Sequence, residues 1–330
     1  MLMGGLIFAV EVGAGFLIDR APLKIRFPQV EKVIGSLQQM ESSKMILFFG
    51  TSRFGNAVSA ETVTQVLRES DAGDGLSVFN AAVGAGDPVV MDFLTDKLLA
   101  VGIRPSIAVI EILPEVLARR NLWLIFHLGR QFRWPEVWNS LPDVYLAGTL
   151  SLALATRFNA VYTFRSQFQQ WMIDALKLPF ESVSSQDEQA RKRRRVNRSQ
   201  PADLEALRKG ASFARKSVRG YEIGGLNARA LIRMIERYSK LETTVVLIAP
   251  PVSSPYRSAY PASVNGAYLD YMRRLGKRYT AYFFDYRDRL PDQQFYTAYY
   301  TTTEGRVHFS RLVAREILIP LLNVQAGLPR

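Results

Sequence analysis

The sequence predicts a doubly wound three-layer α/β/α sandwich built on a five-stranded, mainly parallel β-sheet. From residue 44 onward, short runs rich in β-branched and aromatic residues alternate with segments of helical periodicity, which is typical of parallel strands joined by helices. This alternation stops after Pro114, gives way to helical patterning through residue 222, and then resumes. The chain of 330 residues is 48% apolar and 22% charged, which allows a large core and excludes a disordered protein.

Residues 19–114 are expected to form the first half of the sandwich. Their strands follow from short apolar runs at residues 45–49, 76–80 and 106–113. Ser59 is an N-cap residue directly before a helix expected over residues 60–69. Asp87 and Pro88 form an N-cap and first-turn pair that opens the next helix.

Residues 115–222 are expected to form a helical, aromatic-rich insertion, with helices over residues 144–155 and 161–176. All four tryptophans of the chain lie in it: Trp123, Trp134, Trp138 and Trp171. One interpretation is that these rings pack the core of the insertion itself. The alternative is a lid over a pocket, or a surface that rests on a membrane or a partner.

Residues 223–330 are expected to complete the sandwich. The expected elements are a helix over residues 226–240, strands over residues 243–249 and 279–284, and a last helix over residues 306–319. Pro320 is expected to end that last helix, because proline has no N–H for a helical hydrogen bond.

Residues 1–18 are apolar apart from Glu11, and this length is at the lower limit for crossing a bilayer. We expect a membrane anchor or signal anchor here, and a first buried helix of the globular domain is the alternative. Arg20, Lys24 and Arg26 follow the segment, which by the positive-inside rule favours a cytoplasmic position for the rest of the chain.

Half of the net charge of +12 is concentrated in one short run: Arg191, Lys192, Arg193, Arg194, Arg195 and Arg198. The run is either a solvated surface loop or a contact site for an anionic lipid or polymer. Because no nucleic-acid-binding motif accompanies it, we expect no nucleic-acid partner.

The chain contains no cysteine and two histidines, His127 and His308. This composition excludes disulfides, thiolate nucleophiles, zinc sites that use sulfur, and a three-histidine metal site. We therefore expect neither a metal ion nor an organic cofactor.

Ser52 is the candidate nucleophile, because it lies in a strand-to-helix turn at the carboxyl end of the first strand, where parallel sheets bind ligands. The Gly-x-Ser-x-Gly turn of ordinary α/β-hydrolases is absent, since Phe54 occupies its last position. A simple capping serine would give the same pattern. The Gly84-Ala85-Gly86 turn does not indicate a dinucleotide site, because the third glycine is missing and Asp87 would repel a pyrophosphate.

Three runs of sequence together resemble the SGNH or GDSL-like hydrolases: ILFFGTSRFGNAV, VFNAAVGAGDPVVMDF and DYRDRLPDQQFYTAYYTTTEGRVHFSRLVAREI. The resemblance covers residues 44–114 and 243–319, and it is to envelope-anchored bacterial members related to alginate O-acetyltransferase and the D-alanine-transfer proteins. It implies an SGNH-type, flavodoxin-like sheet order, a membrane-anchored position on the extracytoplasmic face of a bacterial inner membrane, and acylated polysaccharides or small esters as substrates.

The resemblance also implies roles for individual residues. Ser52 matches the family nucleophile, and Gly84 matches a glycine whose N–H helps to stabilise the oxyanion, with Gly86 as the alternative register. The asparagine that supplies a third donor in the family is absent, because the corresponding turn runs from Glu111 to Glu115.

The closing Asp-x-x-His pair of the family is replaced by Thr297 and Tyr300. Tyrosine is a poor proton acceptor at neutral pH, because an unperturbed phenol loses its proton only at about pH 10. His308 and His127 are poor substitutes for the missing base. One of the carboxylates Asp285, Asp288 and Asp292 is a further candidate, although pairing of Asp285 and Asp288 with neighbouring arginines is the preferred interpretation.

Two functions remain open at this point. One is an esterase or O-acyltransferase that acts through Ser52 on an acylated envelope glycan. The other is a non-catalytic pseudoenzyme that uses the cleft to bind a glycan or a protein partner.

Overall fold

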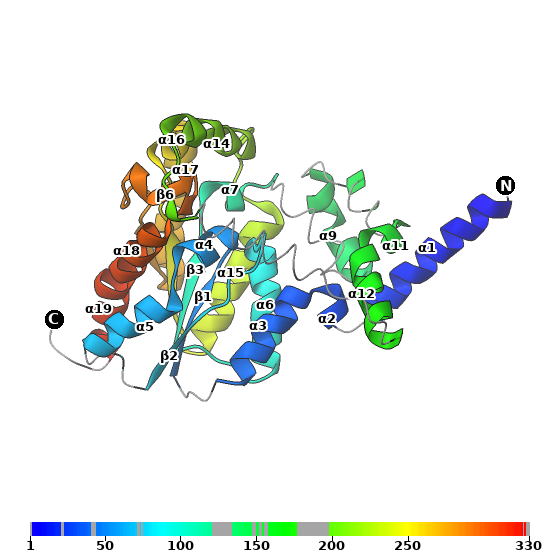
Figure 1. Cartoon of the computed structure of the whole chain (residues 1–330), viewed down its shortest axis with the longest axis horizontal. Coiled ribbons are helices and arrows are strands. Elements are labelled where there is room, and N and C mark those ends of the chain that lie inside the picture. Colours follow the sequence, from blue (N-terminus) through cyan, green and yellow to red (C-terminus); the bar gives the residue numbers. More distant parts are fainter. Residues whose placement is uncertain are drawn as a thin grey trace.

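A computed structural model of the chain describes residues 2–20, 23–40, 44–70, 73, 75–120, 134–146, 150–151, 154, 158–176, 198–325 and 327. Five strands form one parallel sheet in the order β2-β1-β3-β4-β5 (Figure 1). The strands are β1 Lys44–Phe49, β2 Leu76–Asn80, β3 Ile107–Glu111, β4 Thr244–Ala249 and β5 Tyr282–Asp285. Helices cover both faces of this sheet (Figure 1), so the predicted doubly wound α/β/α sandwich is confirmed.

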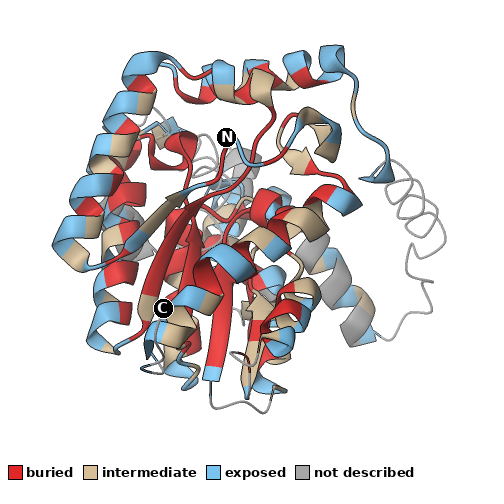
Figure 2. Cartoon of the chain, turned by 90° about the vertical axis from the view of Figure 1, so that its left-hand side faces the viewer, coloured by how far each residue is buried: buried red, intermediate tan, exposed pale blue. Residues whose placement is uncertain are grey.

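The two faces of the sheet carry separate apolar cores, and the period-2 alternation of β1 contributes to both. Met45, Leu47 and Phe49 pack with one core, whereas Ile46 and Phe48 pack with the other. The first core is covered by α3 Pro28–Gln38, α6 Pro88–Ala100, α15 Gly225–Lys240 and α17 Ala262–Tyr279. The second is covered by α4 Ser52–Ala57, α5 Ala60–Glu69 and α18 Thr303–Val313. Figure 2 shows the strands buried between helices whose outer faces are exposed.

Helix caps form as the sequence predicts in the first half of the sandwich. The side chain of Ser59 accepts a hydrogen bond from the N–H of Thr62 at 3.2 Å and begins α5. The side chain of Asp87 accepts from the N–H of Val90 at 3.1 Å and begins α6. Each oxygen satisfies a donor that has no partner within its own helix.

The predicted end of the last helix is wrong. After α18 the chain passes through a π-helical turn, Ala314–Leu318, into α19 Ile319–Gln325. Pro320 is the second residue of α19, where the missing N–H is tolerated, so it does not end the helical segment.

The predicted start of the fifth strand is also too early. Tyr279 closes α17, and Thr280 then adopts a left-handed conformation with φ of 54° before β5 begins.

Within the insertion, the described helices include α9 Trp134–Leu146, α11 Ala160–Thr163, α12 Arg165–Leu176 and α14 Leu204–Ser217, and the short α7 Pro114–Leu117 lies at its start. The predicted helix over residues 144–155 starts too late, because residues 144–146 already belong to α9, and residues 147–149, 152–153 and 155 lie outside the described residues. The predicted helix over residues 161–176 is broken at Phe164. Trp138 is 60% exposed, which contradicts the interpretation that it packs an insertion core. Trp123, His127 and the basic residues 191–195 lie outside the described residues.

The N-terminal helix α1, Leu2–Arg20, packs against α11 at one end of the molecule (Figure 1). The Glu11 carboxylate accepts a hydrogen bond from the N–H of Val161 at 2.9 Å, and the rings of Phe8 and Phe158 stack at 5.8 Å. No helix in the described part of the chain has both the length and the apolar character needed to cross a membrane.

Candidate functional site

The turn after β1 places Ser52 at the carboxyl edge of the sheet, as the first residue of α4. Thr51 is the N-cap residue, and its side chain accepts a hydrogen bond from the N–H of Arg53 at 3.1 Å. Gly50 permits this tight path, because a Cβ atom there would lie 2.6 Å from the Glu111 carboxylate and 2.6 Å from Phe54 Cβ. Ser52 itself is exposed.

A short hairpin that the sequence analysis missed brings Tyr300 to Ser52. The hairpin consists of β6 Phe295–Thr297 and β7 Tyr300–Thr301, and the two hydroxyl oxygens of Ser52 and Tyr300 lie 2.8 Å apart. Thr297 does not contact Ser52. Its hydroxyl instead accepts a hydrogen bond from the N–H of Tyr300 at 3.0 Å and so holds the turn of the hairpin.

Asn56 fastens this hairpin to α4. Its side-chain oxygen accepts hydrogen bonds from the N–H of Thr301 at 2.8 Å and from the Thr301 hydroxyl at 3.2 Å. Because the oxygen is used in this way, the amide nitrogen of Asn56 is the part of the side chain left for a ligand.

Gly84 follows β2, but its N–H already has a partner. It donates a hydrogen bond at 3.0 Å to the side-chain oxygen of Gln29, which comes from the first turn of α3. The glycine loop otherwise packs closely on the turn after β1: the N–H of Val83 donates to the carbonyl of Gly50 at 3.0 Å, and a Cβ on Gly86 would lie 2.5 Å from that carbonyl. In this arrangement Gln29 occupies the donor that an oxyanion would need.

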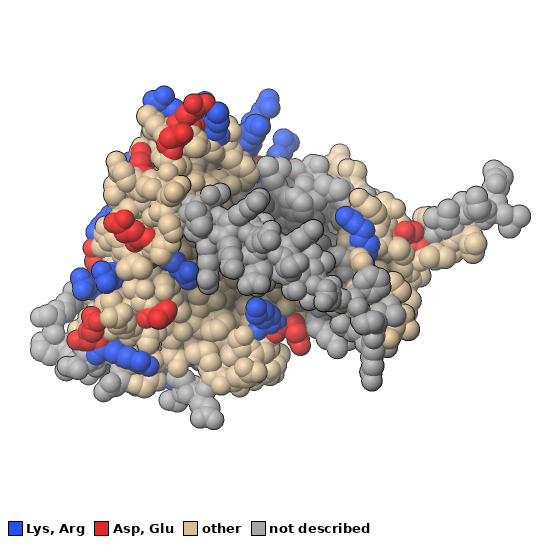
Figure 3. Space-filling model, viewed as in Figure 1, with Lys and Arg blue, Asp and Glu red and all other residues tan. Residues whose placement is uncertain are grey.

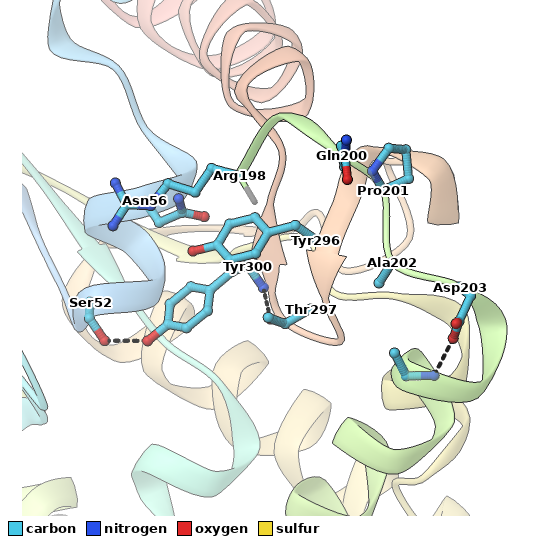
Figure 4. Close-up of a pocket in the computed structure, with 11 residues that line it drawn as sticks. Ser52, Asn56, Arg198, Gln200, Pro201, Ala202, Asp203, Tyr296, Thr297 and Tyr300 are labelled. Atoms are coloured by element: carbon cyan, nitrogen blue, oxygen red, sulfur yellow. Dashed lines mark hydrogen bonds between the residues drawn. The ribbon is translucent and has the colours of Figure 1, made fainter. Parts of the chain in front are cut away.

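Ser52 and Tyr300 open onto a cleft of about 770 Å³. Figure 4 shows Arg198 beside Asn56, with the Tyr300 ring pointing toward Ser52. The rings of Tyr296 and Tyr300 stack at 5.7 Å with 12° between their planes. The cleft is lined by Ser52, Asn56, Arg198, Gln200, Pro201, Ala202, Asp203, Ala206, Tyr296, Thr297 and Tyr300. It combines a flat aromatic surface with hydroxyl, amide and guanidinium donors.

A buried polar network lies directly beneath the Ser52 turn. Arg53 donates to Glu115 at 2.7 Å, and the phenols of Tyr256 and Tyr260 donate to the same carboxylate at 2.8 and 2.6 Å. The rings of Tyr256 and Tyr299 flank the Arg53 guanidinium at 5.4 and 5.1 Å.

The two buried carboxylates of this network differ in acidity. Burial raises the pKa of Glu111 above its usual value, although Arg53 and the hydrogen bonds from Thr51 oppose the change. Burial also acts to raise the pKa of Glu115, but the charge of Arg53 and the hydrogen bonds from Tyr260 and Arg53 outweigh it and hold that pKa below its usual value. Glu115 is therefore an ionised anchor for Arg53.

The network was not predicted from the sequence, where the turn from Glu111 to Glu115 indicates only that the third oxyanion donor is absent. A carboxylate at the end of an otherwise apolar buried strand, followed four residues later by another, was the signal that could have revealed the network. The cation of this network, Arg53, directly follows Ser52 in the sequence.

In the described part of the chain, neither His308 nor the candidate aspartates Asp285, Asp288 and Asp292 supply a base to Ser52. His308 Nδ1 lies 2.9 Å from the side-chain oxygen of Gln294. Asp285 pairs with Arg287 at 2.7 Å, as predicted. Arg289 pairs with Glu316 at 2.6 Å and not with Asp288, because the chain folds back to bring the π-helical turn alongside it.

Asp292 accepts a hydrogen bond at 2.7 Å from the N–H of Ser254, at the start of α16 Ser254–Ser258. His127 lies outside the described residues. No group of three or more potential metal ligands occurs within the described ranges.

A family model described as "Protein of unknown function (DUF1574)" matches residues 24–296. No curated protein matches the sequence. Among solved structures, the chain is similar to an alpha/beta hydrolase enzyme from the metagenome of Lake Arreo, Spain, with 10% sequence identity and a TM-score of 0.38. That match covers 86% of this chain and 98% of the hydrolase.

Proposed function

This chain belongs to the DUF1574 family of proteins of unknown function, and we propose that it is an SGNH-like pseudoenzyme that binds an acylated glycan in the Ser52 cleft without hydrolysing it. The single observation that carries the proposal is the partner of the Ser52 hydroxyl. That partner is the phenol of Tyr300 at 2.8 Å, in the place where a hydrolase of this type needs an imidazole.

Two further features support the absence of hydrolysis. A neutral phenol is a weak proton acceptor, so it does not activate a serine hydroxyl as an imidazole does. In addition, the side chain of Gln29 occupies the N–H of Gly84, which removes a donor for the oxyanion. The site therefore has only a weak proton acceptor beside Ser52, and the N–H of Gly84 is not free for an oxyanion. The cleft itself is open.

The lining of the cleft supports a sugar as the ligand. The stacked rings of Tyr296 and Tyr300 offer an apolar surface of the kind that the flat face of a sugar ring covers. The amide nitrogen of Asn56, the side chain of Gln200 and the hydroxyl of Ser52 supply polar partners for sugar hydroxyls.

The second candidate is a serine esterase or O-acyltransferase that uses the same cleft. The exposure of Ser52 and its hydrogen bond to the Tyr300 hydroxyl favour this alternative. It requires Tyr300 to accept the serine proton, or another group to approach when substrate binds.

Labelling with a fluorophosphonate probe separates the two candidates. We expect the unaltered protein to remain unlabelled at Ser52, and the Thr297→Asp, Tyr300→His double variant to react, because it restores an imidazole and its orienting carboxylate. The triple variant that also carries Ser52→Ala is the control. Labelling of the unaltered protein that is lost in Ser52→Ala would establish the esterase and overturn the pseudoenzyme.

We further propose that the N-terminal helix anchors the chain in a bacterial inner membrane, with the cleft on the extracytoplasmic face. Apolar side chains on α1 that are exposed support this proposal: Leu6, Phe8, Val10, Phe16 and Leu17. Membrane fractionation followed by alkaline carbonate extraction tests it, and release of the full chain into the soluble fraction would contradict it.

A further inference from the structure

Arg198 lies in the cleft, and its positive charge acts on Arg306, which is not among the residues that line the cleft. Arg198 lines the cleft and is the described member of the basic run. Arg306 is in the first turns of α18 and donates a hydrogen bond to the carbonyl of Val58 at 3.0 Å. Burial, and then the positive charge of Arg198, lower the pKa of Arg306 below its usual value.

Among the described residues, the acids nearest to these two arginines do not form ion pairs with them. Within the described residues, neither arginine forms an ion pair with a carboxylate. Glu61 partly offsets the repulsion at Arg306, but it lies beyond ion-pair distance. Asp203 lines the cleft, yet its carboxylate accepts the N–H of Ala206 at 2.7 Å and caps a helix, α14 Leu204–Ser217.

On the face shown in Figure 3, Lys and Arg side chains are interspersed with Asp and Glu, whereas Arg198 and Arg306 have no ion-pair partner among the described carboxylates. Like charges held together without a counter-ion cost free energy, and an anionic ligand removes that cost. The guanidinium of Arg198 also presents a planar set of donors that matches an anionic oxygen group.

We infer that the glycan bound in the Ser52 cleft is anionic, that Arg198 binds its charged group, and that Arg306 strengthens the positive field behind it. The inference rests on the proposed glycan-binding function and specifies the chemical class of the ligand. The charged group is either a uronate carboxylate or a sugar phosphate, since both offer the same anionic oxygens to a guanidinium. Stacking on Tyr296 and Tyr300 would place the sugar ring between the aromatic surface and Arg198.

Calorimetric titration with three kinds of oligosaccharide tests the inference. Hexagalacturonate carries the carboxylates, its methyl ester has the same rings without charge, and a phosphorylated mannan oligosaccharide carries phosphate. We expect the full-length protein to bind at least one charged oligosaccharide about tenfold more tightly than the methyl ester, with an affinity that falls as salt is added. Comparison of the two charged ligands identifies the preferred group.

Matched variants show which arginine produces the preference for charged oligosaccharides. Arg198→Gln should weaken binding of the charged oligosaccharide far more than binding of the methyl ester and so remove most of the preference, and Arg306→Gln should reduce the preference by a smaller factor. Arg68→Gln is the control, because it removes the same charge from an exposed position on α5 that does not line the cleft. Circular dichroism confirms that each variant is folded.

The two proposals fail in different ways. Equal affinity of the unaltered protein for charged and methyl-esterified oligosaccharides overturns the anionic-ligand inference and leaves glycan binding standing. An equal loss in Arg68→Gln and Arg198→Gln also overturns the inference, because the effect would then come from net charge. No binding of any of the three oligosaccharides overturns both proposals.

Discussion

The Nη1 atom of Arg53 lies 2.7 Å from Oε1 of Glu115, and both side chains are buried. Arg53 follows Ser52 in α4, whereas Glu115 lies in α7 Pro114–Leu117, after β3. The pair therefore fixes the turn that carries Ser52 to a segment 62 residues away in sequence. Because ionic groups held in a buried network resist displacement, the position of the Ser52 hydroxyl depends on this contact.

Replacement of Glu115 by Gln should strongly destabilise the protein. The variant leaves the charge of Arg53 buried without its counter-ion, which costs about 3 kcal/mol of the free energy of unfolding. Urea denaturation followed by circular dichroism measures the loss. Asp270→Asn is the control, because it removes an exposed ion pair to Arg273 of similar length, 2.6 Å, and should change stability by less than about 1 kcal/mol. Similar losses in both variants would contradict the role of burial.

Asp87 should make the protein less stable as the pH rises. Burial raises the pKa of Asp87 to about 7, whereas an aspartate in the unfolded chain titrates near its usual value of about 4. Between these values the folded state holds a proton that the unfolded state has lost. The free energy of unfolding therefore falls by about 1.4 kcal/mol for each pH unit, and it is constant above the folded pKa.

Asp87→Asn tests this dependence. Asparagine also caps helices, so α6 should still begin correctly, while the titrating group is gone. The difference in stability between the variant and the unaltered protein should grow in favour of the variant from pH 4 to pH 7. A difference that does not change with pH would show that Asp87 is not the titrating group.

Removal of the Gln29 side chain should free the N–H of Gly84. In the Thr297→Asp, Tyr300→His background, Gln29→Ala should raise the rate of fluorophosphonate labelling at Ser52 by about a hundredfold, since one oxyanion donor contributes that much to acyl transfer. Gln38→Ala, an exposed substitution in the same helix, is the control. An unchanged rate in Gln29→Ala would show that Gly84 does not serve the oxyanion.

The ring of Tyr296 should contribute more to glycan binding than its hydroxyl. Tyr296→Ala removes one of the two stacked rings and should weaken binding of the tightest oligosaccharide by about 0.5 to 1.5 kcal/mol, whereas Tyr296→Phe keeps the ring and should weaken it less. Calorimetric titration measures both variants. Equal losses would assign the contribution to the hydroxyl.

Local patterns predicted most elements of the sandwich. β2 and α5 have the predicted boundaries, because alternation and an N-cap serine are properties of neighbouring residues. The errors occur where local signals compete. Pro320 predicts the end of the last helix, but the π-helical turn before it leads into α19, so the helical segment continues. The β6–β7 hairpin was missed because its strands have three and two residues, too short to show a period.

The candidate site could be predicted only in part. Ser52 follows from its place after the first strand, a position defined within one βα unit. The contact between Ser52 and Tyr300 spans 248 residues, and the contact between the Gly84 N–H and Gln29 spans 55. No spacing along the chain indicates which side chains meet across such distances.

The amino-acid sequence alone therefore determined the class of fold, the strand that leads to Ser52, and the absence of cysteine chemistry, because periodicity, caps and composition are local or countable properties. Only the tertiary structure decided that a phenol faces the Ser52 hydroxyl, that Gln29 occupies the Gly84 N–H, and that Arg53 is neutralised by Glu115. Those relationships arise when the sheet brings the ends of distant strands to one edge, where burial and charge select the partners.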